Sequence, residues 1–242
     1  MCVALPVSAQ NGDPDGGATP FRVGPPPPSK LTIAGANIAL AGVSAAVISK
    51  LRGGSFSRAL LSGSLGGALV YAGKWVSAEH FDGAGLLGRE LAAVGASVVR
   101  NASLDDPILG TVVLPFGPIR IYVVRDWASR RRMRIKADLP ALVSTAYAVW
   151  HPKLDLDLAR SLSAGTPIFV ARESLLGSDR SGMYVAGVIW AKETDPNVVV
   201  GPTRDLIVAH ETVHTIQHDF VFIAWGEPVE RWLLGTSPAG EP

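Results

Sequence analysis

Cysteine is almost absent from this sequence, and neither sign of charge predominates. The 242 residues contain one cysteine, Cys2, so no disulfide can form within the chain. The formal net charge of +1 gives no electrostatic case for a nucleic-acid partner. The chain also lacks the Gly-Lys-Ser/Thr sequence of phosphate loops, although it holds 26 glycines. These absences leave a globular or membrane-associated protein without disulfides as the starting expectation.

The first thirty residues indicate a remnant of an export signal followed by a linker. Residues 1–10 form a short apolar run that ends Val-Ser-Ala, which is typical of a signal-peptide cleavage site near Ala9. The run lacks a basic start, so either the true N-terminus lies upstream or the likeness is accidental. Residues 11–30 are rich in Gly, Asp and Pro and predict an extended linker. We therefore expect an exported, periplasmic or membrane-associated protein, with a cytoplasmic location as the alternative.

Residues 31–105 predict a region of glycine- and alanine-rich helices. Its three segments, 31–49, 59–73 and 83–99, contain few charges and many small residues. The first has the length of a membrane span, but alanine, glycine and serine insert weakly into lipid. Small residues such as Gly63, Gly66 and Gly67 would let helix backbones approach closely. Two interpretations stay open: a membrane-associated hairpin over residues 31–77, or a helical layer packed on the rest of the protein.

From residue 106 to residue 242 the pattern changes to short strands mixed with helices. Alternating or clustered apolar residues predict a small, mostly antiparallel sheet, and Pro140 predicts the start of a helix over 139–150. The expected strands cover residues 119–124, 133–137, 167–171, 183–191 and 198–200. The fold class predicted for the chain is therefore α+β, with the glycine-rich helices first and a single catalytic or binding domain after them.

The sequence His210-Glu211-Thr212-Val213-His214 is the feature with the most specific chemistry. On a helix, residues four apart lie on one face, so His210 and His214 would direct two imidazoles toward one point. Glu211 lies about 100° around the helix, where a general base for a metal-activated water is needed. Apolar residues at 206, 209, 213, 216 and 220 predict the buried stripe of this helix.

This five-residue motif resembles the active-site helix of the zincin metallopeptidases. The resemblance covers about twenty residues, and it implies that His210 and His214 bind Zn²⁺ while Glu211 activates water. The continuation found in metzincins is missing, because Gln217 and Phe220 stand at their glycine and histidine positions. The resemblance is therefore to the gluzincins, which take a glutamate from a following helix.

For that third ligand Glu230 is favoured, with Glu227 and His218 as alternatives. Proline at position 228 predicts a second helix, and Glu230, one turn into it, could project back toward the histidines. His218 stacks above His214 and is expected to be a surface or supporting residue.

The sequence thus predicts a zinc-dependent peptidase that acts on peptide or protein substrates. Residues 183–191 would form an edge strand that holds an extended peptide beside the metal, and Tyr184 could stabilise an oxyanion. Two alternatives stay open: an envelope-associated structural or binding protein with an inactive or structural histidine helix, and a zinc hydrolase with another substrate.

Overall fold

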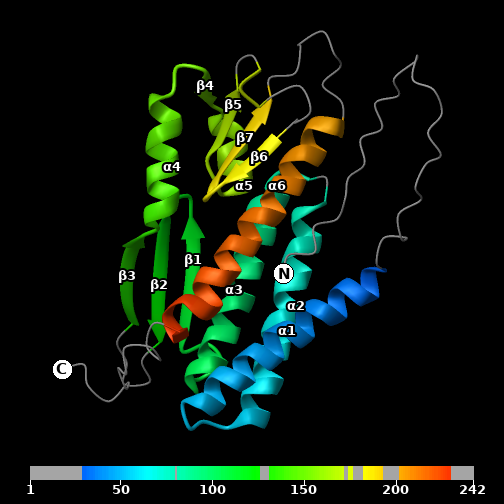
Figure 1. Cartoon of the computed structure of the whole chain (residues 1–242), viewed down its shortest axis with the longest axis vertical. Helices are drawn as coiled ribbons and strands as arrows, with labels where there is room; N and C mark the ends of the chain where they lie inside the picture. The colour runs from blue at the N-terminus through cyan, green and yellow to red at the C-terminus, as the bar shows by residue number, and fades with distance from the viewer. Residues whose placement is uncertain are drawn as a thin grey trace.

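The computed structural model describes residues 29–79, 81–125, 131–171, 174–176, 182–192 and 202–229. These residues form an α+β fold, which confirms the predicted class. Three long helices lie together on one side, and two small sheets lie on the other (Figure 1). A sixth helix, α6 (Pro202–Phe220), runs between the helical layer and the sheets, and it contacts α2, α3, β6 and β7.

The helical layer consists of α1 (Lys30–Leu51), α2 (Phe56–Ser77) and α3 (Ala84–Leu104). Ser29 and Ser55 cap the first two helices by accepting hydrogen bonds from Thr32 and Arg58 amides. Each helix is longer than the sequence pattern predicts, because the polar residues at their ends continue the helical backbone.

The contact between α2 and α3 is made by glycine backbones. A Cβ atom added to Gly73 would lie 2.4 Å from the Gly88 carbonyl oxygen, and one added to Gly66 would lie 2.6 Å from that of Gly95. No side chain fits at either crossing, so glycine is required there for close approach rather than for its flexibility. On the other side of α2, Gly63 and Gly67 meet α1 at Ala45 and Ala41.

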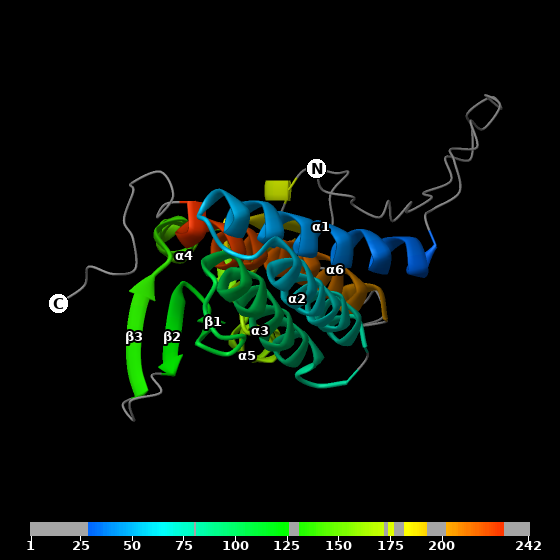
Figure 2. The same cartoon turned by 90° about the horizontal axis from the view of Figure 1, so that it is seen from below.

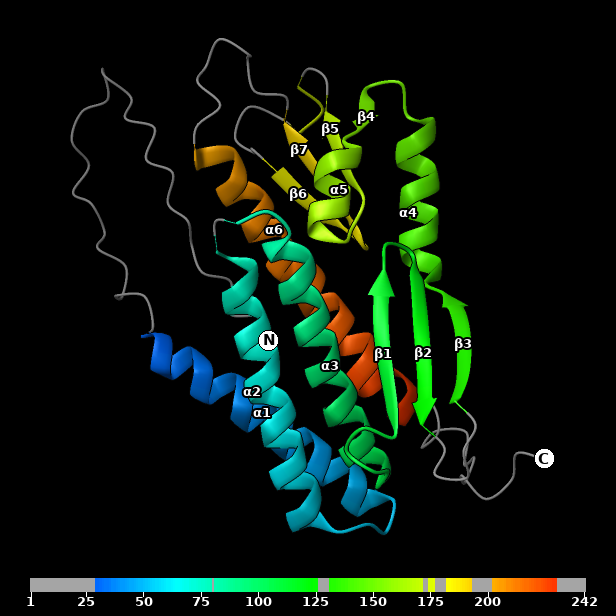
Figure 3. The ribbon, with the colours of Figure 1, turned by 180° about the vertical axis from the view of Figure 1, so that it is seen from behind.

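The first sheet contains three antiparallel strands in the order β1-β2-β3. They are β1 (Thr111–Phe116), β2 (Ile119–Arg125) and β3 (Arg131–Ala137), and β1 packs against α3. Helix α4 (Leu139–Trp150) follows directly, with Asp138 as its cap: the Ala141 amide donates to the Asp138 side chain. Figure 3 shows β3 at the outer edge of the molecule, with α4 continuing from it.

The second sheet is mixed, with strand order β4-β5-β7-β6. Its strands are β4 (Leu154–Leu156), β5 (Ile168–Ala171), β6 (Gly182–Val185) and β7 (Val188–Lys192), and α5 (Leu158–Ala164) joins the first two. The short 3₁₀ helix η1 (Ser174–Leu176) follows β5. The expected predominance of antiparallel pairing is confirmed, because only β5 and β7 among the described strands pair in parallel. The expectation of a single sheet is wrong, because the strands divide into two sheets.

The strand predicted over residues 183–191 is also two strands. Positive φ angles at Ala186 (42°) and Gly187 (90°) make a two-residue turn between β6 and β7. The expected strand at 198–200 lies outside the described residues.

The C-terminal end of α6 continues without a break into η2 (Val221–Gly226), a π-helix. Helical backbone persists from there through Val229. The separate second helix expected in this region is therefore not present among residues 202–229. Ile223 and Ala224 of η2 are buried against the alanine-rich core of the helical layer, and the Trp225 indole N–H donates to Ser44 Oγ of α1.

Among the described helices, α1 is long and apolar enough to cross a membrane. Its N-terminal half diverges from α2 in Figures 1 and 2, and side chains of α2 still reach it: Tyr71 donates to Lys30 O and Lys74 to Asn37 Oδ1. None of the residues 30–40 is buried, whereas Ala41, Ala45 and Ser49 pack inside. The helical layer thus packs against the sheets through α3 and α6, while α1 lies at its outer side.

Candidate metal and catalytic site

The two histidines of the motif lie on one side of α6. The ring centroids of His210 and His214 are 5.0 Å apart, with the ring planes at 86°. Both side chains are half-buried, and α6 packs against β6 at this point. The helical spacing therefore brings the two imidazoles together as the sequence predicts.

This separation matches what one tetrahedral zinc ion requires. A zinc–nitrogen bond is about 2.0–2.1 Å, and roughly 1.2 Å more reaches the ring centre, so two bound imidazoles have centroids about 5.2 Å apart. The His210–His214 distance of 5.0 Å is close to this value. The donor set also suits zinc, since neutral imidazole nitrogens are among its preferred ligands. The pair thus fits the ion that the motif implies.

Gln217 is a hydrogen-bond partner of His214. His214 Nδ1 lies 3.0 Å from Gln217 Oε1. An amide oxygen only accepts, so this contact favours the tautomer with the proton on Nδ1, in which Nε2 keeps its lone pair. Zinc-binding histidines usually donate their second ring nitrogen to such an acceptor. Sequence reasoning treated Gln217 only as the residue that replaces a metzincin glycine, and its position one turn after His214 is the signal that could have identified it.

Glu211 is a buried carboxylate beside the histidines. Its side chain faces the interior, and the residue is 7% exposed. Burial raises the pKa of Glu211 above its ordinary value, and the neighbouring His214, His210 and the Tyr184 backbone amide oppose this rise. A carboxylate whose proton affinity is raised in this way is suited to act as a general base.

The free edge of the second sheet faces α6. β6 is an edge strand, paired only with β7 in this sheet. The Ile189 amide donates to Pro167 O on the β5 side, so the opposed residue Tyr184 turns its own amide away from β7, toward Glu211. The Tyr184 ring also lies over the histidine row, 6.4 Å from His214 and 5.8 Å from His218 between centroids. The motif helix and the strand edge therefore meet at Tyr184.

Glu227 and His218, the two alternatives for the third ligand, make other contacts. Glu227 Oε2 lies 2.7 Å from Arg100 Nη2 and 2.8 Å from Arg100 Nε. His218 packs on Phe222, with centroids 4.6 Å apart, and its Nδ1 lies 4.0 Å from Asp138 Oδ2. Glu230, the favoured candidate, lies outside the described residues.

No three His, Cys, Asp or Glu side chains gather into a metal-binding group within the described part of the chain. Val229, the last residue described, comes 15 positions after His214 along one continuous helix. At about 1.5 Å per residue the two lie roughly 20 Å apart along the axis. Residues 202–229 therefore contain no chain reversal that returns a carboxylate to the histidine pair.

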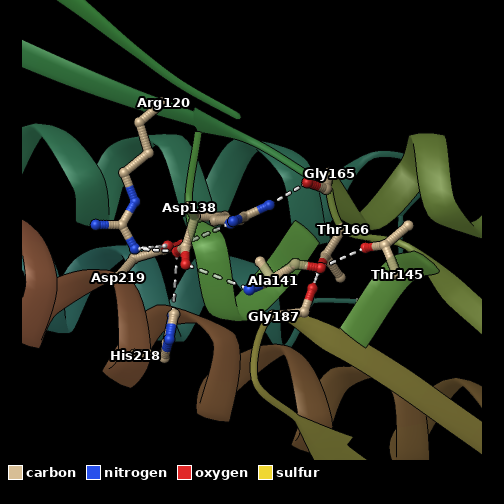
Figure 4. A network of polar contacts seen from close by, with 10 residues as sticks. Arg120, Asp138, Ala141, Thr145, Gly165, Thr166, Gly187, His218 and Asp219 are labelled. Atoms are coloured by element: carbon tan, nitrogen blue, oxygen red, sulfur yellow. Dashed lines mark hydrogen bonds and ion pairs between the residues drawn. The ribbon is translucent and has the colours of Figure 1, made fainter. Parts of the chain in front are cut away.

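A buried network of charges holds α6 against the rest of the fold (Figure 4). Asp219 Oδ2 accepts a hydrogen bond of 2.7 Å from Arg89 Nε of α3, and its Oδ1 lies 3.9 Å from Arg120 of β2. Arg120 also pairs with Asp138, and Arg89 donates to the Gly165 carbonyl. The four charged side chains are 2–8% exposed. Two guanidinium groups and two carboxylates thus balance inside the protein.

The groups around this network have shifted pKa values. Burial lowers the pKa of His218, partly offset by Asp219 and Asp138, which favours its neutral form. Burial raises the pKa of Tyr184, and the charge of Asp219 adds to the rise, so its phenol keeps the proton at neutral pH. The Gly187 backbone amide opposes this rise. Tyr184 Oη is buried, and the hydroxyl keeps its proton as a donor.

Glu90 of α3 is the remaining acid near the network. Burial raises its pKa to about 7, with the Arg89 charge lowering it and the Asp219 charge raising it. Sequence reasoning missed Arg89 and Glu90, although they are the two charged residues in the otherwise small and apolar stretch 83–99. Charge inside such a stretch is a signal of buried polar partners.

Comparison with family models, with curated proteins and with solved structures finds no match for this chain. The resemblance to the zincins therefore rests on the motif of α6 alone.

Proposed function

We propose that the protein is a zinc-dependent peptidase in which His210 and His214 hold the ion and Glu211 is the general base. The observation that carries the proposal is the paired imidazoles, 5.0 Å apart on one side of α6, with the buried Glu211 carboxylate beside them. Gln217 supports it, because it leaves Nε2 of His214 available as a ligand.

Zinc, when bound, would supply Lewis-acid chemistry: it makes water more acidic and polarises the scissile carbonyl. Glu211 would take the proton from the attacking water and return it to the leaving amine. Its raised pKa serves both steps, because a carboxylate with a higher proton affinity takes the proton more readily and can carry it to the leaving amine. The Tyr184 phenol, which keeps its proton, would donate to the oxyanion.

The substrate of this proposal is an extended peptide along the edge of β6. Main-chain pairing gives affinity for a peptide without requiring one sequence. The Tyr184 amide faces Glu211 in this structure, so a peptide that pairs there would replace a contact with the carboxylate. This exchange would free Glu211 for the water as the substrate arrives.

Metal analysis and a casein digest on purified protein test the proposal. Wild type is expected to hold zinc and to cleave casein. Glu211→Gln should keep the metal and lose hydrolysis, whereas His214→Ala should lose both. His151→Ala is the matched control, since His151 ends α4 and contacts Tyr147 rather than the histidine pair, and it should behave as wild type. Wild-type protein that binds no zinc refutes the proposal.

The third ligand stays a prediction, with Glu230 as the candidate. Loss of zinc in Glu230→Ala, with Glu227→Ala as the comparison, would support it. Glu227 pairs with Arg100, so its removal should affect stability more than metal content. Zinc retained by Glu230→Ala would show that the remaining ligand lies elsewhere.

An envelope-associated binding or structural protein is the second candidate function. The exposed, apolar helix α1 favours it and is the observation behind an exported or membrane-associated location. Protein that needs detergent and contains no metal would favour this function over the peptidase.

A further inference from the structure

Helix α1 presents an unbroken aliphatic stripe to the outside. Leu40, Val43, Val47 and Leu51 recur at steps of three and four, which places them on one face of the helix. They are 54%, 50%, 45% and 62% exposed. The opposite face, which includes Ala41 and Ala45, is buried against α2. The aliphatic stripe is thus the face of α1 that does not pack against α2.

Contacts along α1, from Asn37 to Ser44, hold the helix against the rest of the protein. Ser44 accepts from the Trp225 indole at 3.1 Å, and Gly67 of α2 approaches the backbone at Asn37 and Ile38. Moving α1 into the middle of a bilayer would break these contacts. A helix that is held on one side and exposes aliphatic side chains on the other is suited to lie along a surface.

All charges on α1 and α2 themselves have one sign, and the Asp105 carboxylate at the end of α3 lies 4.0 Å from Arg58. Residues 29–78 contain no Asp or Glu and five basic residues: Lys30, Lys50, Arg52, Arg58 and Lys74. The chain has 22 basic and 21 acidic residues, so the remainder carries 17 basic and 21 acidic residues, a formal charge of −4. Lys30 and Lys50 stand at the two ends of α1, and both are exposed. The near-neutral net charge of the chain is therefore the sum of a basic segment, α1 and α2, and an acidic remainder.

We propose that α1 docks in the plane of an anionic lipid bilayer, with its aliphatic stripe in the boundary between headgroups and acyl chains. Lys30 and Lys50 would meet lipid phosphates at the two ends of the helix, each contributing on the order of 1 kcal/mol. A second copy of the chain fits this face poorly, because it would bring ten basic residues together without an acid in either segment. The inference is independent of zinc and of peptidase activity.

Flotation of the full-length protein with vesicles tests the inference. Wild type should bind vesicles of equal parts phosphatidylglycerol and phosphatidylcholine, not bind pure phosphatidylcholine, and be released by high salt. Lys30→Glu with Lys50→Glu should weaken binding by about 30-fold or more, from about 1 kcal/mol at each lysine. Lys136→Glu with Lys153→Glu makes the same change in net charge on other elements and should leave binding within about twofold.

The aliphatic stripe is tested separately with Leu40→Ser and Val47→Ser. Both positions are exposed, so the double variant should keep its fold by circular dichroism and lose at least tenfold in vesicle affinity. Unchanged binding would overturn the role of the stripe. Resistance to alkaline carbonate extraction would overturn docking in the plane in favour of a spanning helix. Light scattering that shows a dimer, abolished by the same double variant, would assign the face to a second copy.

Discussion

Asp219→Asn is the sharpest test of what holds the histidine helix in place. Asparagine keeps the shape of the side chain and removes its charge. The Asp219 carboxylate is 5% exposed and Arg89 is 2% exposed, with Nε and Oδ2 2.7 Å apart. After the substitution, Arg89 loses its carboxylate partner while Arg120 keeps Asp138, so the network changes from balanced to a net charge of +1.

Removal of one partner from a buried ion pair costs about 3–5 kcal/mol, because the other charge stays out of water. Domains are stable by about 5–15 kcal/mol, so this loss is about a fifth of the total or more. For a chain of this size, each kcal/mol lowers Tm by roughly 2–4 °C, which gives a fall of about 6–20 °C. We therefore expect a folded but clearly destabilised protein.

Urea unfolding followed by circular dichroism measures this cost, and Asp82→Asn on the exposed α2–α3 connection is the control. The control should change the free energy of unfolding by less than about 0.5 kcal/mol. The double variant Arg89→Met with Asp219→Leu removes one charge of each sign, so it should be more stable than the two single effects added together. A cost below about 1 kcal/mol for Asp219→Asn, or strict additivity in the double variant, would refute the charge-balance argument.

Three further predictions concern packing, protonation and the metal ligand. Gly73→Ala should destabilise the fold by about 2 kcal/mol or more, because the added Cβ would meet the α3 backbone. Gly35→Ala, where an added Cβ would have nothing within 4 Å, should stabilise the fold by about 0.5–1 kcal/mol, and thermal melts measure both effects. Glu90 binds a proton more tightly in the folded state, so the free energy of unfolding should fall as pH rises from about 4.5 to about 7. Glu90→Gln should remove that fall and be more stable than wild type by up to about 2 kcal/mol at pH 8, after allowance for solvent screening. An unchanged dependence of stability on pH would contradict the prediction. Gln217→Leu should weaken zinc binding by about 10–100-fold in a chelator competition while Gln217→Glu preserves it, and equal affinities in the two variants would exclude a role in orienting the ligand.

The sequence predicts much of the local structure because local patterns determine it. Pro140 indicates α4, the strands expected at 119–124 and 133–137 indicate the β2–β3 pair, and the four-residue spacing of His210 and His214 places both rings on one side of α6. The division of the strands into two sheets was not predictable in this way. It depends on β4 beginning a new sheet and on β5 pairing in parallel with β7 as well as with its neighbour β4, and no local signal specifies these choices.

The buried face of α6 differs from the predicted apolar stripe for a physical reason. Apart from Ile216, its most buried described residues are polar or charged: Glu211, Thr212, Thr215 and Asp219. An amphipathic pattern assumes that charged residues point outward. Here α3 supplies Arg89 from a helix of small residues, so a carboxylate can be buried with a partner that lies 130 positions away in sequence. Periodicity alone cannot detect such a pair.

The π-helical segment at the end of α6 lets the two parts of one continuous helix turn their side chains toward different neighbours. Upstream of Val221, the helix turns its histidines toward β6, and downstream it turns Ile223, Ala224 and Trp225 toward α1 and α3. A π turn holds one more residue than an α turn, so it rotates everything after it. With one residue fewer at this point, the segment would be an ordinary α-helix that keeps the same face toward the same neighbours along its whole length. Shortening the segment by one residue would therefore detach Trp225 from Ser44 and leave the histidines in place.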